Sequence, residues 1–166
     1  MKALLAPLLL MTTFMTSCSD SSSSSGGGET YTSADLSSAL QRLVQTMQMQ
    51  NDMMDSNFRD SLKGGSDYTQ QEIDAWWSYE LAAEKDYKLI AQMMRSSEAL
   101  RDEFCSTMND LFTFAWVEHE EKITEHEKGW ARMSADLKRD KDQFLSVTNS
   151  TEASFLYISD SCELTD

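Results

Sequence analysis

After its first 28 positions the chain contains almost no helix-breaking residues, and this limits its fold more than any other feature. The only proline is Pro7, and beyond the glycines at 26–28 the remaining glycines are Gly64, Gly65 and Gly129. The same stretch is rich in Leu, Met, Ala, Glu, Gln and Lys, which favour helices. We therefore expect an all-α fold in which Gly64 and Gly65 end the first helix.

Apolar side chains recur every three or four residues along three segments, which predicts three long amphipathic helices. The first begins near Ser33, and the second begins at Thr69, where Thr69 and Glu72 match a capping box. Glu80, Ser97 and Arg101 interrupt the apolar stripe of the second segment, whereas the third keeps a heptad-like spacing. The stripes contain Leu36, Leu40, Leu43, Met47, Met54, Phe58 and Leu62; Ile73, Trp76, Ala83, Tyr87, Ile90, Met94, Phe104 and Met108; and Phe112, Trp116, His119, Ile123, His126, Trp130, Met133, Leu137, Asp140, Phe144 and Val147.

Three such helices would form an elongated antiparallel three-helix bundle over residues 31–149, about 45 to 60 Å long, with coiled-coil-like packing. The turn between the second and third helices is poorly marked. We place it at residues 106–110, with Asn109 or Asp110 as N-cap; a turn at 95–97 and one continuous helix are the alternatives. Residues 150–166 are expected to form a C-terminal tail that packs on the bundle.

The N-terminal residues have the composition of a secretory signal. Lys2 supplies a positive start, and small residues follow an apolar run before Cys18. The apolar run at 3–10 is shorter than the roughly 20 residues that a membrane-spanning helix needs. The segment Met15-Thr16-Ser17-Cys18 resembles the lipobox of bacterial lipoprotein precursors.

This resemblance implies how the protein is processed and where it is held. In that family, type II signal peptidase cuts before the cysteine, which then carries diacylglycerol on its sulfur and a fatty acid on its new amino group. Residues 1–17 would be the signal peptide, Cys18 the lipidation site, and the Ser/Gly-rich residues 18–30 a flexible tether. More than one acyl chain gives stable membrane anchoring. Because Ser19 is typical of the outer-membrane class, we expect anchoring in the bacterial cell envelope, at the outer rather than the inner membrane.

The net charge limits the class of molecule that the domain can bind. Removal of Lys2 with the signal takes the net charge from −14 to −15. Such a domain lacks the basic face that nucleic-acid binding needs, and its charge suits a basic partner.

In an exported protein, Cys105 and Cys162 are a candidate disulfide, with two free buried thiols as the alternative.

The two histidines of the chain are candidate metal ligands. His119 and His126 lie one heptad apart, and each is flanked by glutamates. Seven helical residues span about 10.5 Å along the axis, whereas two ligands of one zinc lie about 3 to 4 Å apart. We therefore favour histidines that are buried in the bundle and hydrogen-bonded to polar residues such as Ser97 or the neighbours of Arg101, over a shared metal site.

A methionine-rich segment supplies a second candidate metal site. Met49 and Met53 lie four residues apart, and thioethers are soft ligands for Cu(I). Methionine is also a common core residue. A straight bundle places Met47 level with Trp130 and away from the histidines, so we expect no joint His/Met site. Copper or zinc is thus the alternative to a protein without cofactor.

Two aromatic residues are candidates for contact with a partner. Because Trp76 and Trp77 are adjacent, both cannot point into one core, and Trp77 or Tyr79 would be partly exposed. The sequence shows no glycine-rich phosphate cradle, no Ser/His/Asp motif and no pocket-forming loops, so no catalytic residue is predicted.

The function expected from these features is non-enzymatic. A membrane-anchored acidic helical lipoprotein would present its bundle to a protein partner or act as a spacer in the envelope. One alternative is a periplasmic lipoprotein that handles copper or zinc. Another is an inhibitor or immunity-type module that neutralises a basic enzyme.

Overall fold

The described part of the chain is entirely α-helical. A computed structural model describes residues 30–62, 68–138 and 141–162, and these contain no strand. In chain order the elements are α1 (Ser33–Leu62), α2 (Gln70–Ser96), α3 (Glu98–Glu103), the π-helical η1 (Phe104–Met108), α4 (Asn109–Glu125), α5 (Glu127–Leu137) and α6 (Lys141–Ser161). None of these helices is both long and apolar enough to cross a membrane. The predicted all-α class is confirmed.

Some of the predictions concern residues outside the described part of the chain. These are the signal peptide at 1–17, Cys18, the tether up to residue 29, Gly64, Gly65, Asp140, residues 163–166 of the expected tail, and the side chains of Phe58 and Leu62.

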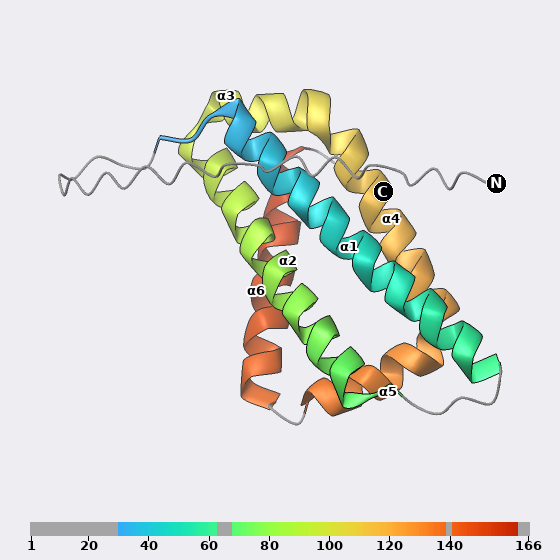
Figure 1. Cartoon of the computed structure of the whole chain (residues 1–166). Coiled ribbons are helices and arrows are strands. Elements are labelled where there is room, and N and C mark those ends of the chain that lie inside the picture. The colour runs from blue at the N-terminus through green and yellow to red at the C-terminus, as the bar shows by residue number, and fades with distance from the viewer. Residues whose placement is uncertain (1–29, 63–67, 139–140, 163–166) are drawn as a thin grey trace, which may run out of the picture.

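Four long helices form a bundle in the spatial order α4, α1, α2, α6 (Figure 1). Helix α1 packs against α2 and α4, and α2 also packs against α6. The segment α3–η1 crosses one end of the bundle, and α5 crosses the other. The prediction of three helices is therefore wrong: the segment expected to be the third helix is divided among α4, α5 and α6. Residues 150–161, expected in the tail, are the second half of α6.

The chain leaves α2 at Ser97, so the turn is at the alternative position rather than at 106–110. Ser97 has an extended backbone (φ −150°, ψ 120°), and its side chain caps α3 by accepting from the Leu100 N–H. The path then stays helical through η1 into α4. A second break falls at His126 (φ −106°, ψ 28°), between α4 and α5. Apolar spacing continues across this break, which is why periodicity alone did not reveal it.

The predicted capping box at the start of α2 is confirmed. The Glu72 N–H donates to Thr69 Oγ1 at 3.2 Å, and the Thr69 N–H donates to Glu72 Oε2 at 2.6 Å. These reciprocal bonds satisfy backbone donors that the first turn of a helix leaves free. The start of α2 is thereby fixed by local sequence alone.

Buried side chains gather into two clusters, one toward each end of the bundle. The cluster on the α3–η1 side contains Leu40, Ile90, Phe104, Phe112 and Ile158, and the cluster on the α5 side contains Met54, Trp76, Met133 and Phe144. The bundle is thus packed at both ends, and the space between these clusters is where the candidate site lies.

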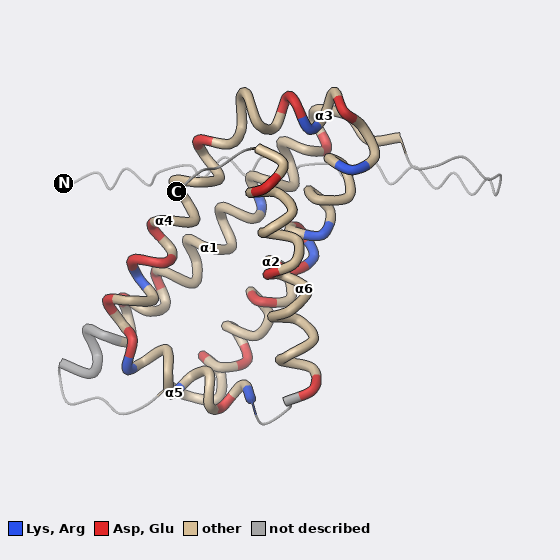
Figure 2. Tube along the Cα trace, turned by 180° about the vertical axis from the view of Figure 1, so that it is seen from behind, with Lys and Arg blue, Asp and Glu red and all other residues tan. Residues whose placement is uncertain are grey.

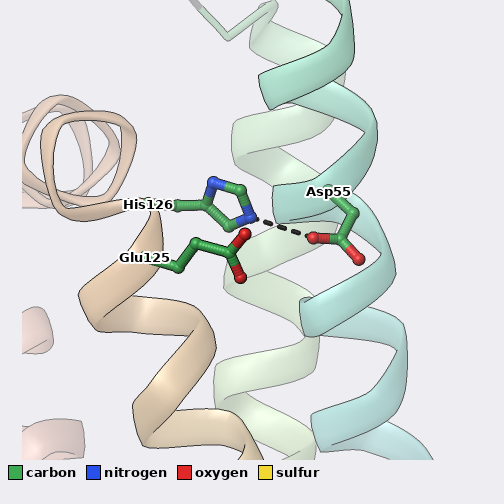
Figure 3. Close-up of side chains that lie close together, drawn as sticks. All are labelled: Asp55, Glu125 and His126. Carbon is green, nitrogen blue, oxygen red and sulfur yellow. Dashed lines mark hydrogen bonds and ion pairs between the residues drawn. The ribbon is translucent and has the colours of Figure 1, made fainter.

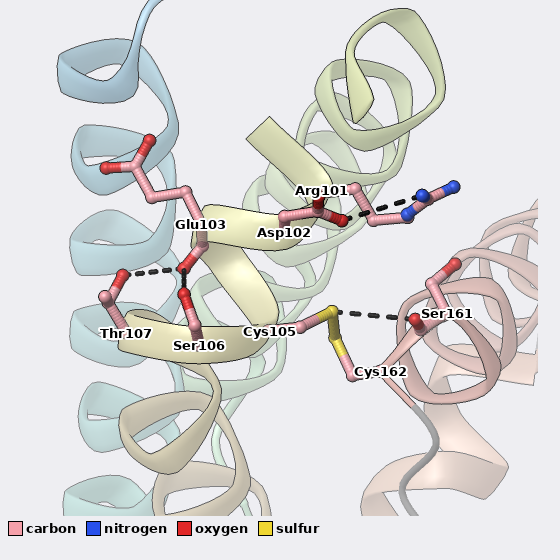
Figure 4. Close-up of a disulfide and its surroundings, with 8 residues drawn as sticks. All are labelled: Arg101, Asp102, Glu103, Cys105, Ser106, Thr107, Ser161 and Cys162. Atoms are coloured by element: carbon pink, nitrogen blue, oxygen red, sulfur yellow. Dashed lines mark hydrogen bonds and ion pairs between the residues drawn. A yellow bond between two sulfur atoms is a disulfide. The ribbon is translucent and has the colours of Figure 1, made fainter. Parts of the chain in front are cut away.

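A disulfide between Cys105 and Cys162 closes one end of the bundle, which confirms the predicted pair (Figure 4). Cys105 belongs to η1, and Cys162 follows directly after α6. Close by, the rings of Trp116 on α4 and Phe155 on α6 stack with centroids 4.2 Å apart. The disulfide and the ring stack together hold α4 and α6 close at this end, whereas the two helices separate toward α5 (Figure 1).

Candidate functional site

A cavity of about 410 Å³ lies in the middle of the bundle, and α1, α2, α4, α5 and α6 all contribute to its lining. This volume is in the range of sites for small organic molecules. The apolar part of the lining is mostly aromatic and consists of Met47, Ala83, Tyr87, Trp116, Ile123, Trp130, Phe144, Phe155 and Leu156.

The five aromatic side chains of the lining, called the aromatic wall below, are Tyr87, Trp116, Trp130, Phe144 and Phe155. Ring contacts hold several of them in place. The Tyr87 ring meets the rings of Trp116 and Phe155 edge-on, each at 6.5 Å between centroids. Trp130 lies 5.2 Å from Trp76, which is fully buried behind the wall. Aromatic pairs at such distances and angles are attractive. The wall is therefore shaped before any ligand arrives.

Glu80 brings a carboxyl group into this apolar lining. Its Oε1 accepts hydrogen bonds from Gln50 Nε2 on α1, at 3.0 Å, and from Trp76 Nε1 on α2, at 3.1 Å. Burial raises the pKa of Glu80, and the two hydrogen bonds offset this in part. Because both bonds end on Oε1, a molecule in the cavity would meet the other oxygen, Oε2.

His119 supplies a second hydrogen-bond acceptor. Its Nδ1 lies 2.6 Å from Asn51 Oδ1, and since that oxygen can only accept, Nδ1 carries the ring proton. Burial lowers the pKa of His119 to about 4, so the ring is neutral at physiological pH. The remaining nitrogen, Nε2, is then an acceptor in a residue that lines the cavity.

Two hydroxyl groups of the lining lack hydrogen-bond partners among the described residues. They are Tyr87 Oη and Thr151 Oγ1, and both are fully buried. Burial raises the pKa of Tyr87 well above its usual value, so its hydroxyl keeps its proton. Buried polar groups are paired in the large majority of cases, and an unmade bond costs about 1–3 kcal/mol. Both oxygens are closed off from the cavity space, so this cost belongs to the fold itself.

His126 lies in a different place, at the corner between α4 and α5 (Figure 3). Its Nε2 is 2.9 Å from Asp55 Oδ1, and potential ligand atoms of Asp55, Glu125 and His126 all fall within 4.8 Å of one another. Lys122 Nζ lies 3.1 Å from Asp55 and 3.0 Å from Glu125. Hydrogen bonding to His126 holds the pKa of Asp55 below its usual value. Because the Lys122 ammonium already pairs with both carboxylates, we interpret the group as an ion-pair network between α1 and α4, called the corner network below.

The structure does not gather the predicted metal ligands into one site. His119 lines the cavity, and His126 belongs to the corner network. Met49 is 50% exposed and Met53 is partly buried, and neither belongs to the cavity lining. Met47 does line the cavity together with His119, so the expectation that Met47 lies away from both histidines is wrong. Met47 is on α1 and His119 is on α4, and these two helices pack against each other in an arrangement that a straight three-helix bundle does not have.

The two predicted contact residues, Trp77 and Tyr79, are half-buried. Trp77 stacks on Phe144 at 6.4 Å between ring centroids, so it packs against α6 as part of the fold. The glutamates around the two histidines, at positions 118, 120, 121, 125 and 127, are all exposed. Acidic residues occur on each long helix rather than on one face (Figure 2).

The cavity itself was missed at the sequence level, because pockets were expected only from loops. Here the cavity arises where two helices diverge, which local sequence does not encode. One signal was present: Glu80 interrupts an apolar stripe, and a carboxyl group on a core-facing stripe often has a specific role. Thr151 carried no such signal.

Comparison of the chain with family models, curated proteins and solved structures finds no match. The function is therefore inferred from the residues of the chain itself.

Proposed function

We propose that the mature chain is a lipid-anchored, non-enzymatic binding protein of the bacterial cell envelope. In this proposal the helical domain holds a small, mostly apolar molecule in its central cavity. The observation that carries the proposal is the lining: an aromatic wall with a few polar groups at fixed positions. That combination is typical of small-molecule sites. The lipobox ending at Cys18 supports the anchor, and the Ser/Gly-rich tether supports a domain that stands off the membrane.

The polar groups favour a bound molecule over an empty apolar space. Tyr87 Oη and Thr151 Oγ1 lack partners among the described residues but are closed off from the cavity space, so only the other polar groups of the lining can meet a ligand. Glu80 and His119 add two acceptors that are held in place by Gln50, Trp76 and Asn51. A ligand that meets even some of these groups gains hydrogen bonds without the cost of ordering the protein.

The proposal is tested with an apolar fluorescent probe, N-phenyl-naphthylamine, titrated into the mature chain carrying Cys18→Ala. We expect saturable one-to-one binding, because a cavity of this size holds one such molecule. Ala83→Phe places a ring in the cavity and should weaken binding by at least about tenfold, or 1.4 kcal/mol. Ala82→Phe is the matched control, since Ala82 lies next to it on α2 but outside the lining.

The pair of variants also separates cavity binding from adsorption to the surface. Leu111, Phe114 and Val117 are exposed apolar residues on α4 that could attract the probe. Binding there would not respond to Ala83→Phe. Equal affinity in both variants, or a titration that never saturates, would therefore refute the proposed function.

A further inference from the structure

The charged side chains that line the cavity are both acidic. Glu80 lies on α2 and Glu152 lies on α6, and the described lining contains no lysine or arginine. The domain as a whole is also strongly acidic. The electrostatic potential in the cavity is therefore negative, and it disfavours anionic ligands.

Glu80 has only neutral hydrogen-bond partners. The donors to its Oε1 are the amide of Gln50 and the indole of Trp76. A buried carboxylate is costly unless a positive group is paired with it. The corner network shows the contrast within the same protein, because there Asp55 has the Lys122 ammonium at 3.1 Å. In the cavity, the corresponding cation would have to come from the ligand.

The aromatic wall is also suited to a cation. The rings of Trp116, Trp130 and Phe155 border the same cavity as Glu80. Ring faces attract ammonium groups, most strongly where water is excluded. The neutral His119 offers Nε2 as an acceptor for a donor on the ligand. Acceptors and ring faces together match a ligand that donates hydrogen bonds and carries positive charge.

We propose that the cavity is selective for amines, in which a protonated nitrogen faces Glu80 and an apolar body lies against the aromatic wall. The charged nitrogen donates to Glu80 Oε2, and the apolar body occupies the space near Phe144 and Leu156. This inference rests on the proposed function, because it requires that the cavity be the binding site. It adds the chemical class of the ligand and the residue that recognises it.

The test compares three probes with one skeleton: phenylbutylamine, phenylbutanol and phenylbutyrate. Each is titrated calorimetrically into the mature chain carrying Cys18→Ala, at neutral pH. We expect the amine to bind at least about tenfold more tightly than the alcohol, and the carboxylate to bind more weakly than both. The three probes differ in charge while their apolar bodies are alike.

Glu80→Gln and Glu84→Gln form the matched pair of variants. In Glu80→Gln the side-chain amide keeps a carbonyl oxygen for the Gln50 and Trp76 donors, so the change removes charge without removing these bonds. Glu84 lies one turn further along α2, pairs with Lys88 at 2.7 Å and is outside the cavity lining. In Glu80→Gln the amine affinity should fall to that of the alcohol, whereas Glu84→Gln should retain the full preference.

The outcomes separate amine selectivity from the proposed function. Equal binding of amine and alcohol to the unsubstituted cavity overturns amine selectivity and leaves the proposed function standing. A preference that survives Glu80→Gln also overturns the inference, because recognition would not depend on Glu80. If none of the three probes binds while N-phenyl-naphthylamine does, the inference fails alone. If the dye fails as well, both proposals fail.

Discussion

At the residue scale, burial shifts the pKa values of two ionisable side chains of the cavity in opposite directions. It lowers the pKa of His119 to about 4 and raises the pKa of Glu80. The same physical cause acts with opposite sign because one group is a base and the other an acid. Their effects on stability therefore run in opposite directions as pH falls.

His119 should make the protein less stable in mild acid. The ring has a pKa near 6.5 when unfolded and about 4 when folded. Well above pH 6.5 the ring is neutral in both the folded and the unfolded protein, so its titration does not change the free energy of unfolding. Below pH 6.5 the unfolded state binds the proton first, and the free energy of unfolding falls by about 2 kcal/mol between about pH 7 and about pH 5.

His119→Gln should remove this part of the acid sensitivity, since a glutamine amide can still donate to Asn51 Oδ1. Urea denaturation at the two pH values measures the effect. Other groups titrate in both proteins, so the relevant quantity is the difference between their losses. Equal losses of unfolding free energy in the two proteins would show that His119 is not held neutral by burial.

At the site, the sequence indicated single residues better than their neighbours. It placed Glu80 among three residues that interrupt an apolar stripe and favoured a buried, hydrogen-bonded His119. The partner it suggested, a polar residue such as Ser97, is wrong, since His119 bonds to Asn51. That pair is separated by 68 residues in the chain and exists because α1 packs on α4. Long-range pairs of this kind depend on helix register, which apolar spacing leaves open.

At the scale of the elements, helix content was predictable and helix boundaries were predictable only where a local motif marks them. The capping box of Thr69 and Glu72 fixed the start of α2. The break at His126 has no such motif, and the apolar spacing passes through it unchanged. The second half of α6 has no such motif either. Tertiary contacts such as the Trp116–Phe155 stack hold it against the bundle.

Loss of the Cys105–Cys162 disulfide should destabilise the domain and loosen the cavity. The bond links positions 57 residues apart, and closing a loop of that length stabilises the folded state by about 2–4 kcal/mol. We expect this decrease in the free energy of unfolding for the double variant Cys105→Ala/Cys162→Ala. Denaturant titration with and without reductant measures it.

The reductant supplies the control for this prediction. It should lower the stability of the unsubstituted protein to that of the double variant and leave the double variant unchanged. N-phenyl-naphthylamine binding should weaken in parallel, because α6 carries one side of the cavity. Unchanged stability after reduction would mean that the ring contacts alone secure α6.

At the scale of the whole molecule, composition predicted the fold class, whereas the arrangement of the helices needed the structure. A chain almost free of proline and glycine had to be helical, but the same composition fits three straight helices or four long ones. The choice is made by contacts between helices, where α4 and α6 pack on different neighbours and leave a cavity between them. The acidic residues are spread over all the long helices (Figure 2).

Membrane association should depend on Cys18 and on no other part of the molecule. The mature domain carries a net charge of −15 once Lys2 is removed, so anionic headgroups repel it. Adsorption of the domain would not replace a lost anchor, whereas several acyl chains hold a protein stably. In a bacterial host, the unsubstituted protein should fractionate with membranes, whereas a Cys18→Ala protein exported behind an ordinary cleavable signal in place of residues 1–17 should be soluble. Ser17→Ala, which keeps a small residue before the cysteine, should remain in the membrane fraction.

Mass spectrometry should find a mature N-terminus at Cys18 carrying diacylglycerol and a fatty acid. A Cys18→Ala protein that stays on membranes after a salt wash would instead place the membrane contact elsewhere in the chain.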